Sequence, residues 1–477
     1  MESTIVMTKC KRLGVLDAAF LTLDSRDVSA HVGILVTLSR PEDASPDFIR
    51  DLVVQLREAT TFTAPFNYRL ARSPLRKFPP TWDVLPDDEV DLDYHFRHSA
   101  LPAPGGQSEL GVLVSRLHSL PLDRRRPLWE CHLIEGLSDG RFAIYVKVHH
   151  ALADGINGTR RIAKMFDVDP ESTRLRAVWQ TEPETSERIR TRVGRRSRVR
   201  RRFQLVGGLG VAVGRILKDA IRPSDPAVAV PFRVPRMEVL NGRIGRERQF
   251  ATQSYPLERV KRVATALGVT VNDVFIGICA GGLRRYLAEF HELPQKSLVA
   301  GTPVSLRRTG DGRGNAIAML VAKLFTEVAD PVDRIRLVSR STMVAKQKFY
   351  ALPQFVGDYY GVLTNGPSIL QNIIGTAGRS RPPFNLVISN IPGSREPLYL
   401  HGARVLEAYP ISLLAHGQAL NITVISSAGQ FNVGFVGCRD RLPHMQRLAL
   451  YAGEALGEIE AVLGLVAPDL NESEVVH

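Results

Sequence analysis

Cysteine is scarce in this chain of 477 residues. Only Cys10, Cys131, Cys279 and Cys438 are present, they lie far apart, and no two of them form a CxxC pair. Disulfide frameworks and cysteine-based zinc sites need closely spaced or paired cysteines, so this spacing argues against both. We therefore expect a protein that keeps its thiols reduced, in the cytoplasm.

Long apolar runs are also missing. The best candidates, LVGGLGVAVG from Leu205 and AIAMLVA from Ala316, fall far short of the roughly 18 uncharged residues that a membrane span requires. Near the N-terminus, Asp17, Asp24 and Arg26 interrupt every apolar stretch, so no signal-peptide core is expected. The sequence predicts a protein that is soluble or peripheral to a membrane.

Acidic residues do not balance the basic ones. The formal net charge is +13, and residues 181–222 carry twelve Arg or Lys against four Asp or Glu. Nine arginines fall between Arg188 and Arg202. This run is either a solvated connector or an electrostatic anchor. We favour a membrane anchor over residues 188–222, because clustered Lys and Arg each gain about 1 kcal/mol near an anionic leaflet. Aromatic residues are not interleaved with the arginines, so no nucleic-acid partner is expected.

What the chain does have is a globular composition, with 44% hydrophobic and 7% aromatic residues, and enough length for two cores. Strand-like and helix-like patterns alternate in the first 180 residues and resume from about residue 245, and the segment between is rich in arginine, glycine and proline. The pattern predicts two mixed α/β domains, at 1–180 and 241–477, joined by a basic linker at 181–240. A cleft between two such domains is a natural ligand site.

Hydrophobic periodicity predicts the main elements. Apolar residues at three- and four-residue spacing indicate helices, and alternating apolar residues indicate strands. Asp139-Gly140 is a typical hairpin signal between two of the strands, and Gly268 is placed to stop a helix. The expected helices are 47–60, 109–122, 155–169, 256–268 and 271–290, and the expected strands are 28–40, 129–137, 142–150, 296–307, 385–393, 418–429 and 431–440.

The stretch HHALADGINGTRRI places His149 and His150 just ahead of an Asp-Gly pair. If 142–150 is one strand, Val148 and His150 lie on its apolar face and His149 lies on the other. His150 should then enter a water-poor interior, unless the strand has already ended. A neutral imidazole there can accept a proton, since its unperturbed pKa is about 6.5. Asp154 follows in the turn, where it can cap the next helix or pair with a distant cation.

Three interpretations of this motif compete. The plainest is two structural histidines and a helix-capping aspartate. A metal site is disfavoured by Gly155 and by the strand-to-turn setting, and no third ligand is apparent, so we expect no metal. The third is a general base that deprotonates an acceptor. The motif alone does not favour the structural interpretation over the general base, or the reverse.

The wider sequence resembles one family. HHALADG is similar to the HHxxxDG active-site motif of CoA-dependent acyltransferases, and the surrounding segments resemble the bacterial wax ester synthase/diacylglycerol acyltransferase family over nearly the whole chain. The segments occur in the order of that family, although the linker is unusually rich in arginine. They are LGVLDAAFLTLD with AHVGILVTL, RRPLWECHLIEGL, HHALADG, VTVNDVFIGICAGGLRRYL, AGTPVSLR, NLVISNIPG and GQALNITVISSAGQFNVGFVGCRD.

The resemblance implies a fold of two chloramphenicol-acetyltransferase-like α/β domains with a tunnel between them. It also implies acyl transfer from acyl-CoA to a lipid hydroxyl, either of diacylglycerol, giving triacylglycerol, or of a long-chain alcohol, giving a wax ester. Carried over by position, His150 is the catalytic base, His149 a supporting neighbour and Asp154 mainly structural, with Gly155 completing the motif. Arg307 is the expected cation partner of Asp154.

The implied chemistry needs no covalent intermediate, because CoA thiolate is a good leaving group and His150 can both take and return the proton. No cofactor is expected besides acyl-CoA as co-substrate. The expected partners are acyl-CoA, a lipid alcohol or diacylglycerol, and the inner membrane face or lipid inclusions. The alternatives are a relative that acylates a polyketide or another specialised acceptor, and a weakly active or non-catalytic lipid-binding paralogue.

Further candidates for substrate contact lie in the family-like segments. For Asn272 and Asp273 helix capping is the favoured role, and for Trp129 packing is favoured. Ser389 and Asn390 belong to a segment expected to form a tight turn beside the tunnel. The sequence does not identify the group that stabilises the oxyanion.

Overall fold

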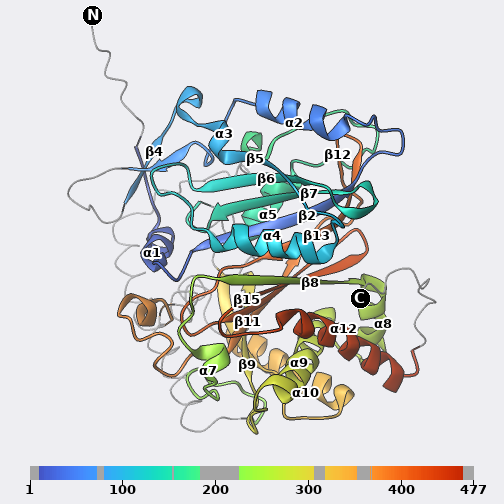
Figure 1. Ribbon diagram of the computed structural model, residues 1–477. Helices are drawn as coiled ribbons and strands as arrows, with labels where there is room; N and C mark the ends of the chain where they lie inside the picture. The colour runs from blue at the N-terminus through green and yellow to red at the C-terminus, as the bar shows by residue number, and fades with distance from the viewer. Residues whose placement is uncertain are drawn as a thin grey trace, which may run out of the picture.

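The computed structural model describes residues 10–71, 80–152, 155–182, 225–305, 317–351 and 366–465, except Pro367. Two lobes stack on each other, each built on a six-stranded sheet (Figure 1). A separate three-stranded sheet lies at one flank and has the order β1-β4-β3. Its strands are β1 (Cys10–Arg12), β3 (Tyr68–Leu70) and β4 (Thr81–Val84).

The sheet of the first lobe has the order β12-β13-β2-β7-β6-β5. The predicted hairpin of β6 and β7 is confirmed, since the two strands are antiparallel and Asp139 has a φ of 60° in the turn between them. Alternation along β7 also holds: Phe142, Ile144 and Val146 belong to one apolar core. The strands are β2 (His31–Ser39), β5 (Phe96–Ala100), β6 (Trp129–Glu135), β7 (Phe142–His149), β12 (Tyr399–Leu400) and β13 (Ala403–Ile411).

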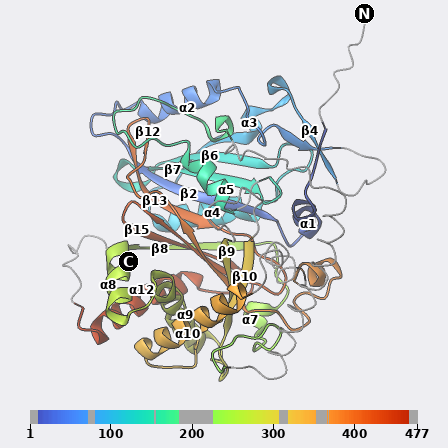
Figure 2. The same cartoon turned by 180° about the vertical axis from the view of Figure 1, so that it is seen from behind.

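Two strands of this sheet come from the C-terminal part of the chain. β13 pairs antiparallel with β2, with Tyr409 opposite Leu35, and β12 extends the edge (Figures 1 and 2). Neither strand was among those expected from the sequence. The predicted boundaries of the domains stay a prediction, because 183–224, most of the expected linker, lies outside the described residues.

The sheet of the second lobe has the order β10-β9-β11-β14-β15-β8. β11 runs parallel to both of its neighbours and the other pairs are antiparallel. The four strands predicted after residue 290 are all present in it. The strands are β8 (Arg248–Pro256), β9 (Val299–Ser305), β10 (Ile317–Lys323), β11 (Leu386–Pro392), β14 (Leu420–Ser427) and β15 (Gln430–Cys438).

The predicted helices are also present. Gly268 ends α8 in the left-handed conformation, as expected from its position. The helices are α1 (Val15–Leu23), α2 (Phe48–Glu58), α3 (Leu92–His95), α4 (Gln107–Ser119), α5 (Gly155–Ala163), α7 (Glu238–Asn241), α8 (Leu257–Leu267), α9 (Val271–Phe290), α10 (Pro331–Tyr350) and α12 (Met445–Val462).

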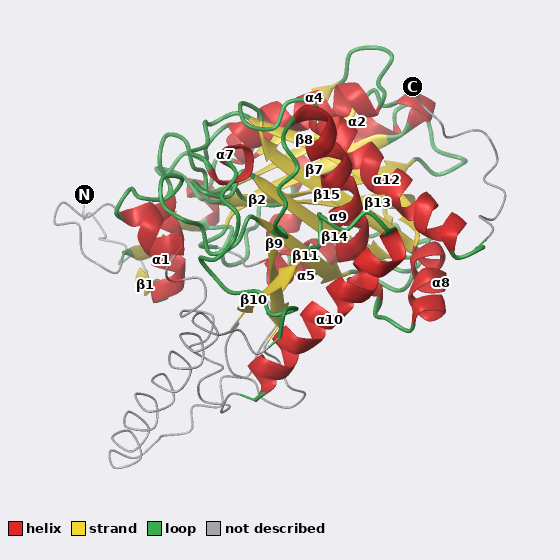
Figure 3. Cartoon of the chain, turned by 90° about the horizontal axis from the view of Figure 1, so that it is seen from below, coloured by secondary structure: helices red, strands yellow, loops and turns green. Residues whose placement is uncertain are grey.

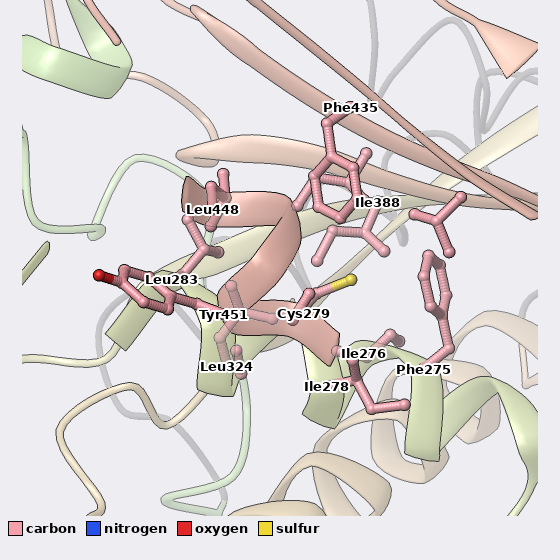
Figure 4. Close-up of a cluster of buried hydrophobic side chains, with 14 of the residues drawn as sticks. Phe275, Ile276, Ile278, Cys279, Leu283, Leu324, Ile388, Phe435, Leu448 and Tyr451 are labelled. Carbon is pink, nitrogen blue, oxygen red and sulfur yellow. The ribbon is translucent and has the colours of Figure 1, made fainter. Parts of the chain in front are cut away.

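Helix α9 forms the centre of the second lobe. Helices α8, α10 and α12 pack against it (Figure 3). Gly282 allows a close approach of α12, because a Cβ atom there would lie 2.9 Å from the main-chain nitrogen of Ala452. Figure 4 shows Phe275, Cys279 and Leu283 of α9 in one buried cluster with side chains of α12 and the sheet. Each fully buried side chain of this size contributes about 1.5–3 kcal/mol.

Helix α4 joins the two lobes. Its apolar side covers the first sheet, and two serines on it face β8, the edge strand of the second sheet. The hydroxyl of Ser115 accepts a hydrogen bond from the main-chain N–H of Phe250 at 2.9 Å, and that of Ser119 accepts one from Arg248 at 2.8 Å. These bonds satisfy edge-strand donors that would otherwise be unpaired.

Over the described residues, no single helix is long and apolar enough to cross a membrane. Helices α8 and α9 reach that length and composition only together, and they are bent by 102° relative to each other.

Candidate active site

The paired histidines lie at the end of the central strand β7. The strand ends at His149, and His150 is the first residue of the turn that follows. His150 was expected on the apolar face of the strand unless the strand ended before it, and the strand does end before it. His150 does not extend the apolar row of Val148; its main-chain N–H donates to the carbonyl of Ala30 at 2.8 Å. Its side chain is partly buried, with one face of the ring stacked on Phe20.

His149 is fully buried and both of its ring nitrogens are engaged. Nε2 lies 3.0 Å from a carboxylate oxygen of Asp24, and Nδ1 accepts a hydrogen bond from the main-chain N–H of Ala151 at 3.0 Å. Because Nδ1 is an acceptor, the proton of the neutral ring sits on Nε2 and is donated to Asp24. His149 therefore orients the turn and has no nitrogen left to act on a substrate.

His150 is suited to accept a proton. Burial, with a smaller contribution from the neighbouring His149, lowers its pKa to about 4, while its own main-chain carbonyl opposes that shift. The ring is therefore neutral at neutral pH, which is the form that a general base requires. The centroids of the His150 and Phe20 rings are 3.9 Å apart, at an angle of 22°.

Some predicted site residues cannot be placed. Asp154, Arg307 and the basic segment 188–222 lie outside the described residues, so the Asp154–Arg307 pair and the membrane anchor stay predictions. Gly155 is the first residue of α5, as expected for a helix that follows the motif.

Asp273 lies in the first turn of α9 and closes a capping box with Thr270. Its carboxylate also accepts hydrogen bonds from Thr342 at 2.5 Å and Ser339 at 3.1 Å, both on α10. A buried carboxylate with this many donors joins the two helices. This arrangement matches the capping role favoured for Asp273, although Thr270 rather than Asn272 is the N-cap residue.

Asn272 instead faces a cavity of about 420 Å³ in the second lobe. The amide of Asn390 donates to the side-chain oxygen of Asn272 at 3.4 Å, so two of the predicted contact residues meet at this wall. Ser389 does not line the cavity, and the tight turn expected at Ser389 and Asn390 is wrong, since both residues lie within strand β11 and pair with β14. The lining residues are Asn272, Thr302, Pro303, Val304, Leu320, Ala322, Thr342, Ala345, Lys346, Ile388, Asn390, Pro392 and Ser426.

The cavity lies close to the contact between the lobes. Ile391 and Ile425 pack against the core of the first lobe, whereas their chain neighbours Asn390, Pro392 and Ser426 line the cavity. The walls combine apolar side chains with a nearly equal share of polar groups, namely amides, hydroxyls and one amine, that of Lys346. Such a lining suits a ligand with an apolar chain and a few polar groups.

Trp129 lies in the interior of the first lobe and is fully buried. Its indole stacks on His95 and on Trp179, with centroid distances of 4.4 and 5.4 Å, and its N–H donates to the carbonyl of Phe66 at 2.8 Å. This placement favours the packing role.

Sequence reasoning missed two residues that contact the histidines, Phe20 and Asp24. Both belong to the family-like segment LGVLDAAFLTLD, but nothing in that segment indicates which of its residues reaches a strand more than a hundred positions away. It also missed a buried polar layer beneath α4, where His31 and Tyr145 contact His118 and Lys147 contacts Glu130.

The chain matches two family models. One, the wax ester synthase/diacylglycerol acyltransferase catalytic domain, covers residues 13–275, and the other, the WS/DGAT C-terminal domain, covers residues 313–460. The chain belongs to the wax ester synthase/diacylglycerol acyltransferase family. The predicted family is therefore confirmed, and the protein is an acyl-CoA acyltransferase of the WS/DGAT type that acts in lipid metabolism.

Relatives of this WS/DGAT protein match it over most of its length. A protein of Mycobacterium tuberculosis H37Rv, named provisionally as a diacylglycerol O-acyltransferase, is 41% identical over 490 residues, covering 95% of this chain and 98% of the relative. The solved structure of a wax ester synthase/diacylglycerol acyltransferase from Marinobacter aquaeolei VT8 has 36% identity and a TM-score of 0.76, covering 95% of this chain and all of the other.

A more distant structure shares only the fold. The first condensation domain of the CDA synthetase is 16% identical, with a TM-score of 0.57 and 96% of each chain covered. The predicted fold class, two chloramphenicol-acetyltransferase-like α/β domains, is confirmed for this WS/DGAT protein. The tunnel between the domains stays a prediction.

Proposed function

We propose that this protein transfers a fatty acyl group from acyl-CoA to the hydroxyl of a lipid, with His150 as the general base and without a covalent enzyme intermediate. The acceptor is diacylglycerol, giving triacylglycerol, or a long-chain alcohol, giving a wax ester. The observation that carries the proposal is the state of His150. It is neutral, partly buried and fixed through its main chain at the end of β7, within a chain of the WS/DGAT family.

The proposed reaction begins when the acceptor hydroxyl loses its proton to the free nitrogen of His150 while its oxygen attacks the thioester carbonyl. The tetrahedral oxyanion then collapses, the carbon–sulfur bond breaks and CoA leaves as thiolate, which takes the proton back from the imidazolium. A positioned base contributes about 10²–10⁴-fold to the rate. Orientation of the two substrates and stabilisation of the oxyanion supply the remainder.

The environment of His150 supports both protonation states in turn. A low pKa keeps the ring neutral before the reaction. When the ring becomes an imidazolium, the face of Phe20 is in place to attract the cation, an interaction of about 0.5–2 kcal/mol.

In this proposal the cavity bounded by Asn272, Asn390 and Lys346 holds part of one substrate. Its mixed lining fits a ligand with both an apolar chain and polar groups, and the cavity lies beside the contact between the lobes. The basic segment 188–222 would hold the protein at an anionic lipid surface, where acceptors and products reside. Neutralising its nine arginines should then reduce co-sedimentation with anionic liposomes and spare activity on a soluble acceptor.

The test offers radiolabelled palmitoyl-CoA with diacylglycerol, hexadecanol or no acceptor, to the parent protein and to the His150→Ala and His150→Gln variants. We expect a labelled neutral lipid from the parent and a loss of about 10²–10⁴-fold in both variants. Circular dichroism confirms that the variants are folded. A folded His150→Ala variant with full activity would remove His150 from the mechanism, and a parent that releases CoA only by hydrolysis would contradict the lipid acceptors.

A further inference from the structure

Asp24 lies directly after α1 and uses its two carboxylate oxygens for two different partners. Oδ1 accepts a hydrogen bond from the main-chain N–H of Ala30 at 2.6 Å. Oδ2 accepts one from Nε2 of His149 at 3.0 Å. Arg124 holds the same oxygen from the solvent side, at 3.2 Å. Burial alone would raise the pKa of Asp24, but these contacts, above all the one with His149, lower it, so the group is a carboxylate at neutral pH.

The two partners of Asp24 in turn hold the main chain on each side of the base. The carbonyl of Ala30 accepts the N–H of His150 at 2.8 Å, and Nδ1 of His149 accepts the N–H of Ala151 at 3.0 Å. These four hydrogen bonds form a closed ring that passes through the peptide units of His150. The side chain of Asp24 closes this ring, because it bonds to both Ala30 and His149.

Phe20 acts on the same residue from the same helix. It precedes Asp24 by four positions, so both residues lie on one side of the end of α1. Its ring stacks on the imidazole of His150 at 3.9 Å. Helix α1 is itself anchored there, since its buried Ala18 and Leu21 belong to one apolar cluster with Ala151. In Figures 1 and 2 α1 lies at one flank of the molecule, outside both sheets.

We infer that Asp24 and Phe20 are positioning residues for His150. Asp24 sets where its main chain lies and Phe20 sets the plane of its ring. The inference rests on the proposed role of His150 as the base. Both residues act on the reaction through His150, Asp24 through its main chain and Phe20 through the face of its ring, so their loss lowers the fraction of enzyme with a correctly aimed nitrogen and leaves substrate binding intact. Displacement of a reacting group by about 1 Å costs on the order of 10²-fold in rate.

Substitutions at Asp24 are graded by the number of hydrogen bonds that they keep. Asp24→Asn has one oxygen acceptor, so it can satisfy Ala30 or His149 but not both, whereas Asp24→Ala satisfies neither. We expect kcat to fall by about 10- to 100-fold in Asp24→Ala, by less in Asp24→Asn, and by about 10-fold in Phe20→Leu. KM for acyl-CoA should change by less than about threefold.

Two matched controls lie on α2, a helix of the first lobe that makes none of the contacts with His149 and His150 described above. Asp51→Ala removes an exposed carboxylate from α2, and Phe48→Leu removes a ring that stacks on a histidine remote from the site, His401, at 6.1 Å. Both should keep kcat within about twofold. A smaller loss of kcat in Asp24→Asn than in Asp24→Ala, with an unchanged KM, distinguishes a positioning role from a general loss of folded protein.

The decisive measurement combines the variants. If Asp24 acts through His150, Asp24→Ala has no further effect on kcat in a His150→Ala background. Equal activity of Asp24→Ala, Phe20→Leu and the parent would overturn the inference while leaving the base in place. Full activity of His150→Ala would instead refute the proposed function. A multiplicative loss in the double variant would also overturn the inference, because Asp24 would then act independently of His150.

Discussion

Nζ of Lys147 and Oε2 of Glu130 are 2.9 Å apart on the neighbouring strands β7 and β6, and the lysine side chain has no exposure to solvent. Two main-chain carbonyls of the segment that ends α4, those of Leu117 and Leu120, accept further hydrogen bonds from the ammonium. The ion pair therefore ties α4 to the centre of the sheet, two residues before His149. Interaction with His132 and Lys147 overcomes burial and lowers the pKa of Glu130 to about 2.

Removing one partner of this pair should be strongly destabilising. Lys147→Met leaves the Glu130 carboxylate buried without its main counter-charge, and we expect a loss of about 3–5 kcal/mol in the free energy of unfolding. The matched control is Lys261→Met, which removes an exposed ion pair with Glu258 and should cost less than about 1 kcal/mol. Urea unfolding measures both. Similar losses in the two variants would show that burial of the pair has no energetic consequence.

Gly33 should not tolerate a side chain. A Cβ atom there would lie 2.8 Å from the ring of Tyr145 and 3.0 Å from the carbonyl oxygen of Val146, so Gly33→Ala should cost about 1–3 kcal/mol. Gly457→Ala is the control, because a Cβ atom added there on α12 would meet no described atom outside its own helix within 4 Å, and it should be neutral or stabilising by up to about 1 kcal/mol. Thermal unfolding shows whether each substitution stabilises or destabilises the protein. A Gly33→Ala protein as stable as the parent would contradict the packing described.

The pH dependence of activity should reflect the low pKa of His150. A base is active when neutral, so activity is lost as the pH falls through the pKa of about 4 and is constant above it. We expect kcat/KM to be flat between about pH 5.5 and 8. An inflection near pH 6.5, the value of an unperturbed histidine, would show that the base is not in the environment described.

Stability should decrease at mildly acidic pH. Burial lowers the pKa of His95 to about 4 and that of His118 to about 3, so below pH 6.5 the unfolded chain binds protons that the folded chain does not. The free energy of unfolding therefore falls as the pH drops from about 6.5 towards 4, by about 1.4 kcal/mol per unit for each such group. Glu130 contributes in a lower window, where stability is lost between about pH 4.5 and 2.

Urea unfolding at several pH values measures the stability lost in each of these two pH windows. In His95→Gln, which keeps a side-chain donor for the carbonyl of Trp129 but does not titrate, the dependence between pH 6.5 and 4 should be weaker than in the parent. If the free energy of unfolding of His95→Gln depends on pH as strongly as that of the parent, His95 is not held neutral in the folded protein.

Local pattern was sufficient for much of the architecture. The hairpin of β6 and β7, the helices α8 and α9 and the strand β14 follow from periodicity and from residues such as Asp139 and Gly268, because hydrogen bonds within a helix or a hairpin join neighbours in the chain. The motif at His149 and His150, with the other family-like segments, was sufficient for the family and for the identity of the expected base.

Contacts between distant parts of the chain needed the fold. The pairing of β13 with β2 and the bond between Asp24 and His149, which are 125 residues apart, cannot be read from local pattern, because a strand edge or a carboxylate does not specify its partner. The same holds for the position of His150. The motif gives its residue type, but the end of β7, the Ala30 carbonyl and the ring of Phe20 decide where its nitrogen lies, and burial in the folded protein keeps the ring uncharged.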